Sequence, residues 1–184
     1  DIVAIGRYNV SRNFALLQAP SGVFRGNASL LASGAFGVDS TSNSRMRGQL
    51  QFNNTPLSWL SPVLKDYVSG LGGVLNGNVQ LRGPVSAPDM TGQVALSNAA
   101  LRVDYLGTNY RIPRADILIS DREITFGEVR LLDQYNNEAA LTGSIDHDHL
   151  NDFSLRLRLT SDKFEVLNLK DYESEYFYGH LVAQ

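Results

Sequence analysis

Residues 153–160, FSLRLRLT, alternate apolar and polar side chains without an error. Successive side chains of a β-strand point to opposite faces of a sheet, so the phenylalanine and the leucines share one face and the two arginines share the other. This stretch is therefore expected to be a strand with one apolar and one polar side.

The same alternation recurs along much of the chain, with turn-forming residues between the repeats. Further strands are expected at 45–52, 74–83, 91–97, 116–120, 123–131, 138–146 and 176–183. Two prolines predict a turn at 83–88, and a register change near Gly127 predicts a bulge or turn. Strands at this spacing favour an all-β chain with sequential, antiparallel pairing.

The first 54 residues show a weaker version of the pattern, diluted by glycine. They are expected to form strands with turns at 20–22 and at 40–44. Because the chain opens on what resembles the middle of a strand, we expect a segment of a longer protein.

A helical insertion is expected near residues 56–69, within the region 55–70. Its apolar residues recur at steps of three and four: Leu57, Leu60, Leu64 and Val68. Thr55 is the expected N-cap, Pro56 the first helical residue and Gly70 the C-terminal stop. Pro62 can divide the segment into two short helices.

Composition excludes several classes of function. The chain has 184 residues, a net charge of −3 and no cysteine, so a cysteine–zinc site and a disulfide framework are excluded. The acidic balance argues against nucleic-acid binding. Apolar runs are too short for a transmembrane helix. No nucleophile, phosphate-loop or metalloprotease motif is present, so we expect no enzyme and no cofactor.

One cluster, residues 146–149 (DHDH), carries metal-ligand residue types. A solvated turn is the favoured interpretation, with no metal. Arg156 and Arg158 are interpreted as the outer face of a strand, although lipid phosphates are a second possibility. The remaining acids are expected in solvent: Asp104, Asp116, Asp121, Glu123, Glu128 and Asp133.

Two aromatic groups also stand out. Trp59 and Tyr67 belong to the helical insertion, which is interpreted either as a lid over the apolar face or as a cap that fills it. The second group is interpreted as a strand end with its packing: Tyr172, Tyr176, Phe177 and Tyr178.

The apolar face can be satisfied in three ways: a closed barrel, a second sheet packed against it, or an open groove. Periodicity alone favours a filled core. Glycine and alanine within the strands, however, allow a sheet to curl into a trough lined by aliphatic side chains. Such a trough suits acyl chains.

Residues 75–101 resemble the repeat of the TamB family, the translocation and assembly module subunit. Gly77, Gly83, Pro88 and Gly92 match the spacing of that repeat. Residues 103–112, 138–145 and 171–179 are similar to its Bacteroidetes-type form. The likeness covers about Pro56 to Gln184, so 71–184 would be family repeats and 1–184 one segment of a longer repeating β-groove.

This resemblance implies an elongated, curled antiparallel β-taco in the periplasm, similar to bridge-like lipid transfer proteins. It implies phospholipid acyl chains as ligand. It also implies an inner-membrane anchor and an Omp85-type outer-membrane barrel, which would be contacted by other parts of the full protein.

The expected lipid-binding residues are the inward aliphatic and aromatic side chains. They are Val79, Leu81, Val94, Leu96, Ile117, Ile119, Ile124, Phe126, Leu141, Ile145, Leu155, Leu157 and Leu159. The alternative is a structural or adhesive β-solenoid or β-sandwich with a filled core and no ligand. A third possibility, a carbohydrate-binding or hydrolase domain, would need periodic aromatics, which the chain lacks.

Overall fold

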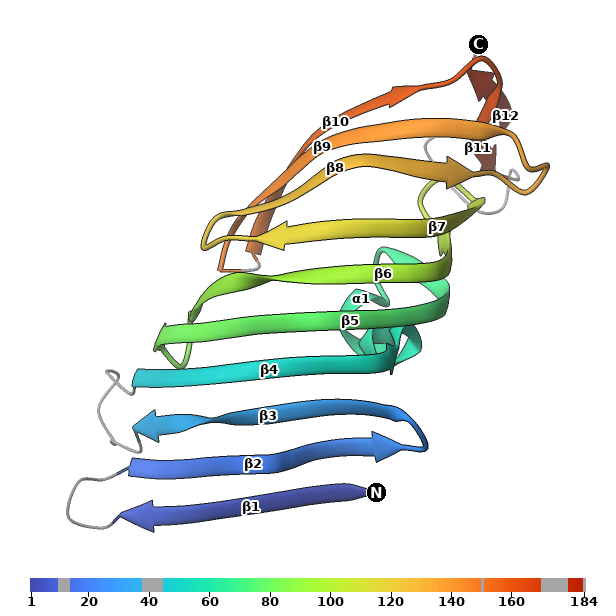
Figure 1. The fold of residues 1–184 in the computed structure, drawn as a ribbon. Coiled ribbons are helices and arrows are strands. Elements are labelled where there is room, and N and C mark those ends of the chain that lie inside the picture. Colours follow the sequence, from blue (N-terminus) through green and yellow to red (C-terminus); the bar gives the residue numbers. More distant parts are fainter. Residues whose placement is uncertain (10–13, 38–44, 150, 170–178, 184) are drawn as a thin grey trace.

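A long antiparallel sheet dominates the protein (Figure 1). The computed structural model describes residues 1–9, 14–37, 45–149, 151–169 and 179–183. Ten strands pair in sequence order, each with its neighbours along the chain. They are β1 (Ile2–Asn9), β2 (Phe14–Arg25), β3 (Ala28–Gly37), β4 (Arg45–Pro56), β5 (Val68–Pro84), β6 (Asp89–Val103), β7 (Thr108–Ile119), β8 (Glu123–Leu132), β9 (Glu138–Asp148) and β10 (Asn151–Thr160).

The prediction of an all-β, elongated antiparallel sheet is confirmed, and the first 54 residues belong to that same sheet. The turn at 83–88 is confirmed between β5 and β6. A register shift between Phe126 and Val129 confirms the bulge near Gly127.

The end of the chain departs from the expected repeat. β11 (Phe164–Leu169) and β12 (Gly179–Ala183) form a separate two-stranded sheet and do not extend the main one. Phe164 is fully buried, and its ring stacks on Tyr110 of β7 with centroids 5.2 Å apart. The β11–β12 pair therefore covers part of the main sheet. The predicted cluster at 172–178 lies outside the described residues.

The helical insertion is present but shorter than predicted. It consists of a 3₁₀ helix, η1 (Leu57–Leu60), followed by a one-turn α-helix, α1 (Ser61–Leu64), so it is divided into two short helices between Leu60 and Ser61, and Pro62 lies in the first turn of α1. Thr55 is not its N-cap, because this residue belongs to β4 and its hydroxyl donates to the carbonyl of Ser29 at 2.6 Å. Gly70 is not its stop, because β5 has already begun.

The predicted turn at 20–22 is wrong, because these residues continue β2 through a register shift. Ser21 explains the continuity. Its side chain is buried, its Oγ accepts from the backbone N–H of Ile5 at 2.8 Å, and it lies within hydrogen-bond distance of the Gln18 carbonyl. Backbone groups that lose their hydrogen bonds to the neighbouring strand at the register shift therefore bond to the side chain of Ser21. The other predicted turn, 40–44, lies outside the described residues.

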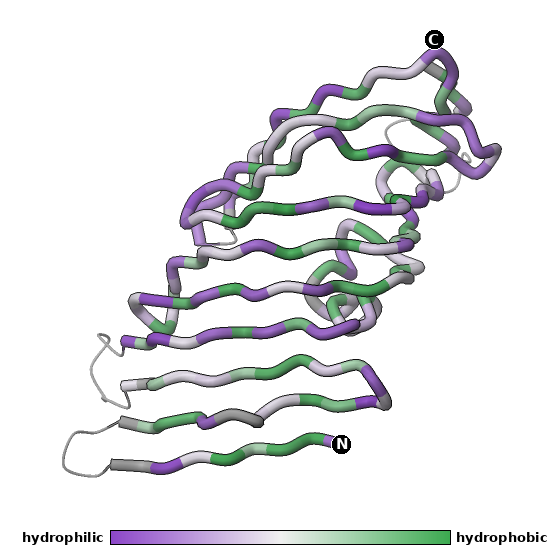
Figure 2. The backbone as a smooth tube through the Cα atoms, in the orientation of Figure 1, coloured by the Kyte–Doolittle hydropathy of each residue, from purple (hydrophilic) through white to green (hydrophobic). Residues whose placement is uncertain are grey.

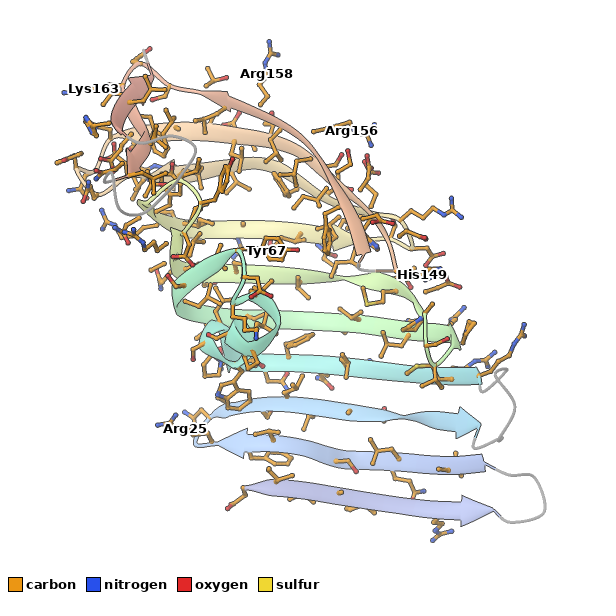
Figure 3. The ribbon with its side chains drawn as sticks, turned by 180° about the vertical axis from the view of Figure 1, so that it is seen from behind. Arg25, Tyr67, His149, Arg156, Arg158 and Lys163 are labelled. Carbon is orange, nitrogen blue, oxygen red and sulfur yellow. The ribbon has the colours of Figure 1, made fainter. Side chains whose placement is uncertain are left out.

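The sheet curls toward the face that carries the insertion (Figures 1 and 3). The ring of Tyr67, just after α1, meets Phe153 of β10 edge-on with centroids 6.4 Å apart. At the other end of the strands, Nδ1 of His149 lies 3.4 Å from the carbonyl oxygen of Pro88, in the β5–β6 turn. The start of β10 and the turn before it therefore come back over the sheet and reach elements that precede them by several strands.

Candidate functional site

A continuous apolar row crosses all ten strands of the main sheet. Each member lies opposite the next in the strand register. The row is Ile2, Val23, Leu30, Phe52, Gly77, Val94, Ile117, Phe126, Gly143 and Leu157. Neighbouring strands lie about 4.8 Å apart, so nine intervals give a row about 43 Å long.

A second row runs beside the first, two residues away along each strand. It comprises Ala32, Leu50, Val79, Gly92, Ile119, Ile124, Ile145 and Leu155. Every member of both rows is apolar or glycine. Because the rows run across the strands, they join the individual apolar faces into one lining along the long axis of the sheet.

Glycines within the first row lie beside aromatic rings. Gly77 lies opposite Phe52, and Gly143 lies opposite Phe126. Both glycines have positive φ, +140° and +138°, and a Cβ on either would lie 2.2 Å or less from a carbonyl oxygen of the next strand. Only glycine fits such a backbone, which allows the sheet to bend, and the facing rings cover the gap that glycine leaves.

Burial of the thirteen predicted residues rises toward the centre of the sheet. Val79 and Val94 are buried, at 5% exposure each. Those on β10 are exposed: Leu155, Leu157 and Leu159. The rest are half-buried: Leu81, Leu96, Ile117, Ile119, Ile124, Phe126, Leu141 and Ile145. The structure places all thirteen on one apolar face, and among them exposure is greatest on edge strand β10.

Two elements of the chain already cover parts of this face. Leu60 of the insertion packs on the central cluster formed by Phe52, Leu75, Val79 and Val94. Phe164 of β11 belongs to a second cluster, with Tyr110 and Ala115 of β7 and residues of β8 and β9. Leu96 packs against both clusters. The face is therefore capped at two places, and its β10 leucines stay accessible.

Hydrophilic and hydrophobic residues alternate along the strands (Figure 2), so the opposite face is largely polar. Arg156 points away from the apolar face (Figure 3), and its Nη2 lies 2.6 Å from Asp146 and 3.2 Å from Glu123. Arg158 shares that face and is exposed. The interpretation of both arginines as the outer face of a strand is confirmed.

The residues at 146–149 point in different directions. Asp146 pairs with Arg156, whereas His147 is buried and lies 6.4 Å, ring centroid to centroid, from Phe153. His149 contacts the β5–β6 turn. In the described part of the chain, no group of three or more histidine and acidic side chains is arranged to hold a metal ion.

Asp133 contradicts the expectation that the acids lie in solvent, because it is fully buried. Its carboxylate accepts hydrogen bonds from the backbone N–H groups of Tyr135, Asn137 and Glu165 and from the Asn137 amide, at 2.8–3.1 Å. Burial raises the pKa of Asp133, but these hydrogen bonds outweigh it and hold the pKa below its ordinary value.

Glu165 of β11 is also fully buried, where β11 meets the main sheet. Its carboxylate accepts from Gln134 Nε2 at 2.9 Å and lies 3.0 Å from Nε2 of His180. Its backbone carbonyl accepts from the Tyr110 hydroxyl at 3.0 Å. Burial raises the pKa of Tyr110, so the phenol stays neutral. These contacts anchor the β11–β12 pair to the sheet.

Comparison of the chain with known protein families, curated proteins and solved structures gave no match. The resemblance to the TamB family therefore depends on the quoted motifs alone. Within the described residues, no helix is long and apolar enough to cross a bilayer.

The predicted lipid-binding set left out the first four members of the first row, namely Ile2, Val23, Leu30 and Phe52. The strands of Ile2, Val23 and Leu30 have weak alternation, and the place of all four residues in the row depends on cross-strand register. A row of partners could be found from sequence only if every bulge were known, because one shift reverses the faces of a strand.

Proposed function

We propose that this protein is a non-enzymatic lipid carrier whose curled sheet holds phospholipid acyl chains along its apolar face. The observation that carries the proposal is the first cross-strand row, in which ten strands supply only apolar residues and glycine. A filled core explains burial at the centre of the sheet. It does not explain leucines that remain 37–61% exposed on β10.

The chemistry of the lining suits retention without a deep binding site. Each methylene removed from water contributes about 0.8 kcal/mol, so an acyl chain on the rows is held in proportion to the apolar surface that it buries. Neighbouring positions along a row are alike, so a tail can shift by one strand at little cost. Head groups remain in water beside the exposed edge at β10.

The TamB resemblance supplies the setting of the proposal. The chain acts in the periplasm as one segment of a groove between the inner and outer membranes. Its role is phospholipid transfer, assistance to outer-membrane protein assembly, or both. Contacts with an Omp85-type barrel and with the inner membrane belong to other parts of the full protein.

A structural protein without ligand is the second candidate. It is favoured by the insertion and the β11–β12 pair, which cover two parts of the apolar face with the chain's own side chains. In that case the exposed leucines of β10 would serve contact with another protein segment.

Mass spectrometry of lipids extracted from the purified chain tests the proposal. Wild-type protein should carry phospholipid, and Leu157→Asp should reduce the bound lipid about tenfold or more, because a carboxylate would interrupt the first row. Leu157 is 45% exposed, so the substitution leaves the fold intact. Strand content by circular dichroism checks this.

Thr160→Asp is the matched control. It adds the same charge to the same strand, but Thr160 is exposed and belongs to the polar face. It should retain lipid. Absence of lipid from folded wild-type protein, or equal lipid in both variants, would reject the groove and favour the structural candidate.

A further inference from the structure

Three arginines gather on the polar face where β4 begins and β5 ends. Arg47 lies directly opposite Arg82 in the register, and Arg45 lies two residues away on the same face of β4. Together with Ala35, Met46 and Gly83 they line an open depression of about 490 Å³. This volume lies within the range of small-molecule sites, roughly 300–1,000 Å³.

The charges in this depression are not balanced by ion pairs in the described part of the chain. Arg114, Arg130 and Arg156 each pair with a carboxylate, whereas no carboxylate of the described residues pairs with Arg45, Arg47 or Arg82. Arg82 donates to the neutral amide of Gln80 at 3.0 Å.

The carboxylate opposite Arg82 in the register is that of Asp89. Its Oδ1 lies 3.8 Å from Nδ1 of His149, and it forms no ion pair with Arg82. Like charges placed directly opposite in a sheet are destabilising. Asp89 lies on the side of Arg82 away from Arg47, so the repulsion between the two arginines remains, and an anion bound between them would offset it.

The side chains that line the depression favour a phosphate-type oxyanion. Ala35 lies opposite Arg47 on the next strand, and its methyl group leaves the space open beside the guanidinium groups. A guanidinium is a planar fork that binds two phosphate oxygens at once, and two opposed forks can grip one phosphate from both sides.

We propose that Arg45, Arg47 and Arg82 bind a phosphate-type oxyanion, either a phosphate ester carried by a lipid head group or a soluble phosphate. The site lies on the face opposite the apolar rows. It therefore stands independently of the proposed lipid groove, and either can fail alone.

Thermal unfolding of the full chain tests the site. Phosphate should raise the melting temperature of wild-type protein more than chloride does at equal ionic strength. The double variant Arg47→Gln/Arg82→Gln should lose this difference, with at least about a tenfold weaker phosphate affinity. Without phosphate at low salt, the variant should melt at or above the wild-type temperature, because the opposed charges are gone.

Arg114→Gln/Arg158→Gln is the matched control. It removes two positive charges from exposed positions of the same polar face and should keep the phosphate-specific stabilisation. Flotation with phosphatidylglycerol and phosphatidylcholine vesicles then identifies the source of the phosphate.

Each outcome decides the proposal. Phosphate stabilisation lost only in the Arg47/Arg82 variant supports a site for soluble phosphate. Vesicle binding that needs phosphatidylglycerol and is lost only in that variant supports a lipid head group. Equal loss in both variants shows a net-charge effect and overturns the site, as does the absence of any phosphate or vesicle response in wild-type protein.

Discussion

Asp133 shows how one buried carboxylate joins two sheets. It closes the β8–β9 turn through Tyr135 and Asn137, and it accepts from the backbone of Glu165 at the start of the β11–β12 pair. Removing one partner of a buried charged hydrogen bond costs more than the bond itself contributes, because the partner stays desolvated. The residue therefore controls the docking of the β11–β12 pair.

Asp133→Asn should lower the free energy of unfolding by about 2 kcal/mol. The amide places an N–H₂ group among groups that all donate, so some of them lose their acceptor. Urea unfolding at neutral pH measures the loss. Asp121→Asn, in the exposed β7–β8 turn, is the control and should change stability by less than about 0.5 kcal/mol.

The same residue predicts a pH dependence in acid. The pKa of Asp133 is lower in the folded than in the unfolded state, so the unfolded chain binds more protons between the two values. Its stabilising contribution is complete above the ordinary carboxyl pKa of about 4 and is lost as pH falls through the folded value. The difference in free energy of unfolding between wild type and Asp133→Asn should therefore shrink as pH falls through this window. A difference independent of pH would contradict it.

At the scale of elements, the insertion is held by packing and not by helix propensity. η1 and α1 contain four residues each and have no side-chain cap, so they could not persist alone. Leu57 is buried and Leu60 packs on the central cluster. Leu57 and Leu60, two of the regularly spaced apolar residues of the segment, therefore pack inward, although one continuous helix does not form.

Leu57→Ala should destabilise the protein by about 3 kcal/mol, because it opens a cavity under η1. Ser58→Ala, the exposed neighbour, should have little effect. Denaturant unfolding of the two variants measures the contrast. Equal stability of both would mean that the insertion is not anchored through its apolar side.

At the scale of the whole molecule, the sheet has a well-packed centre and two weak edges. Leu75, Val79 and Val94 of β5 and β6 are buried, whereas Ile2 of β1 is 83% exposed. β1 and β10 each pair on one side in the main sheet. Local opening should therefore begin at the edges.

Hydrogen exchange should follow this gradient. Ladder amides of β5 and β6 should exchange about a hundredfold more slowly than those of β1 and β10, which corresponds to about 2.8 kcal/mol in opening free energy. Exchange measured by mass spectrometry on peptides from each strand tests it. Uniform protection across the sheet would contradict the gradient.

The alternation of residues 153–160 and of the sharper repeats was sufficient to predict strands, their two faces and the all-β class, because period-two patterning is a property of each strand by itself. All thirteen candidate residues accordingly lie on one face. Asp133 was misjudged because its partner Glu165 comes 32 residues later along the chain. The turn at 20–22 was misjudged because a bulge uses the same residue types.

What the amino-acid sequence by itself determined is therefore the chemical identity of the two faces of each strand. Tertiary structure decided how those faces meet: the register that aligns ten strands into one row, the curl that brings Phe153 to Tyr67, and the departure of β11 and β12 from the sheet. The physical reason is that these features depend on bulges, positive-φ glycines and contacts between distant residues. Which of these form is decided by the free energy of the whole fold and not by any one strand.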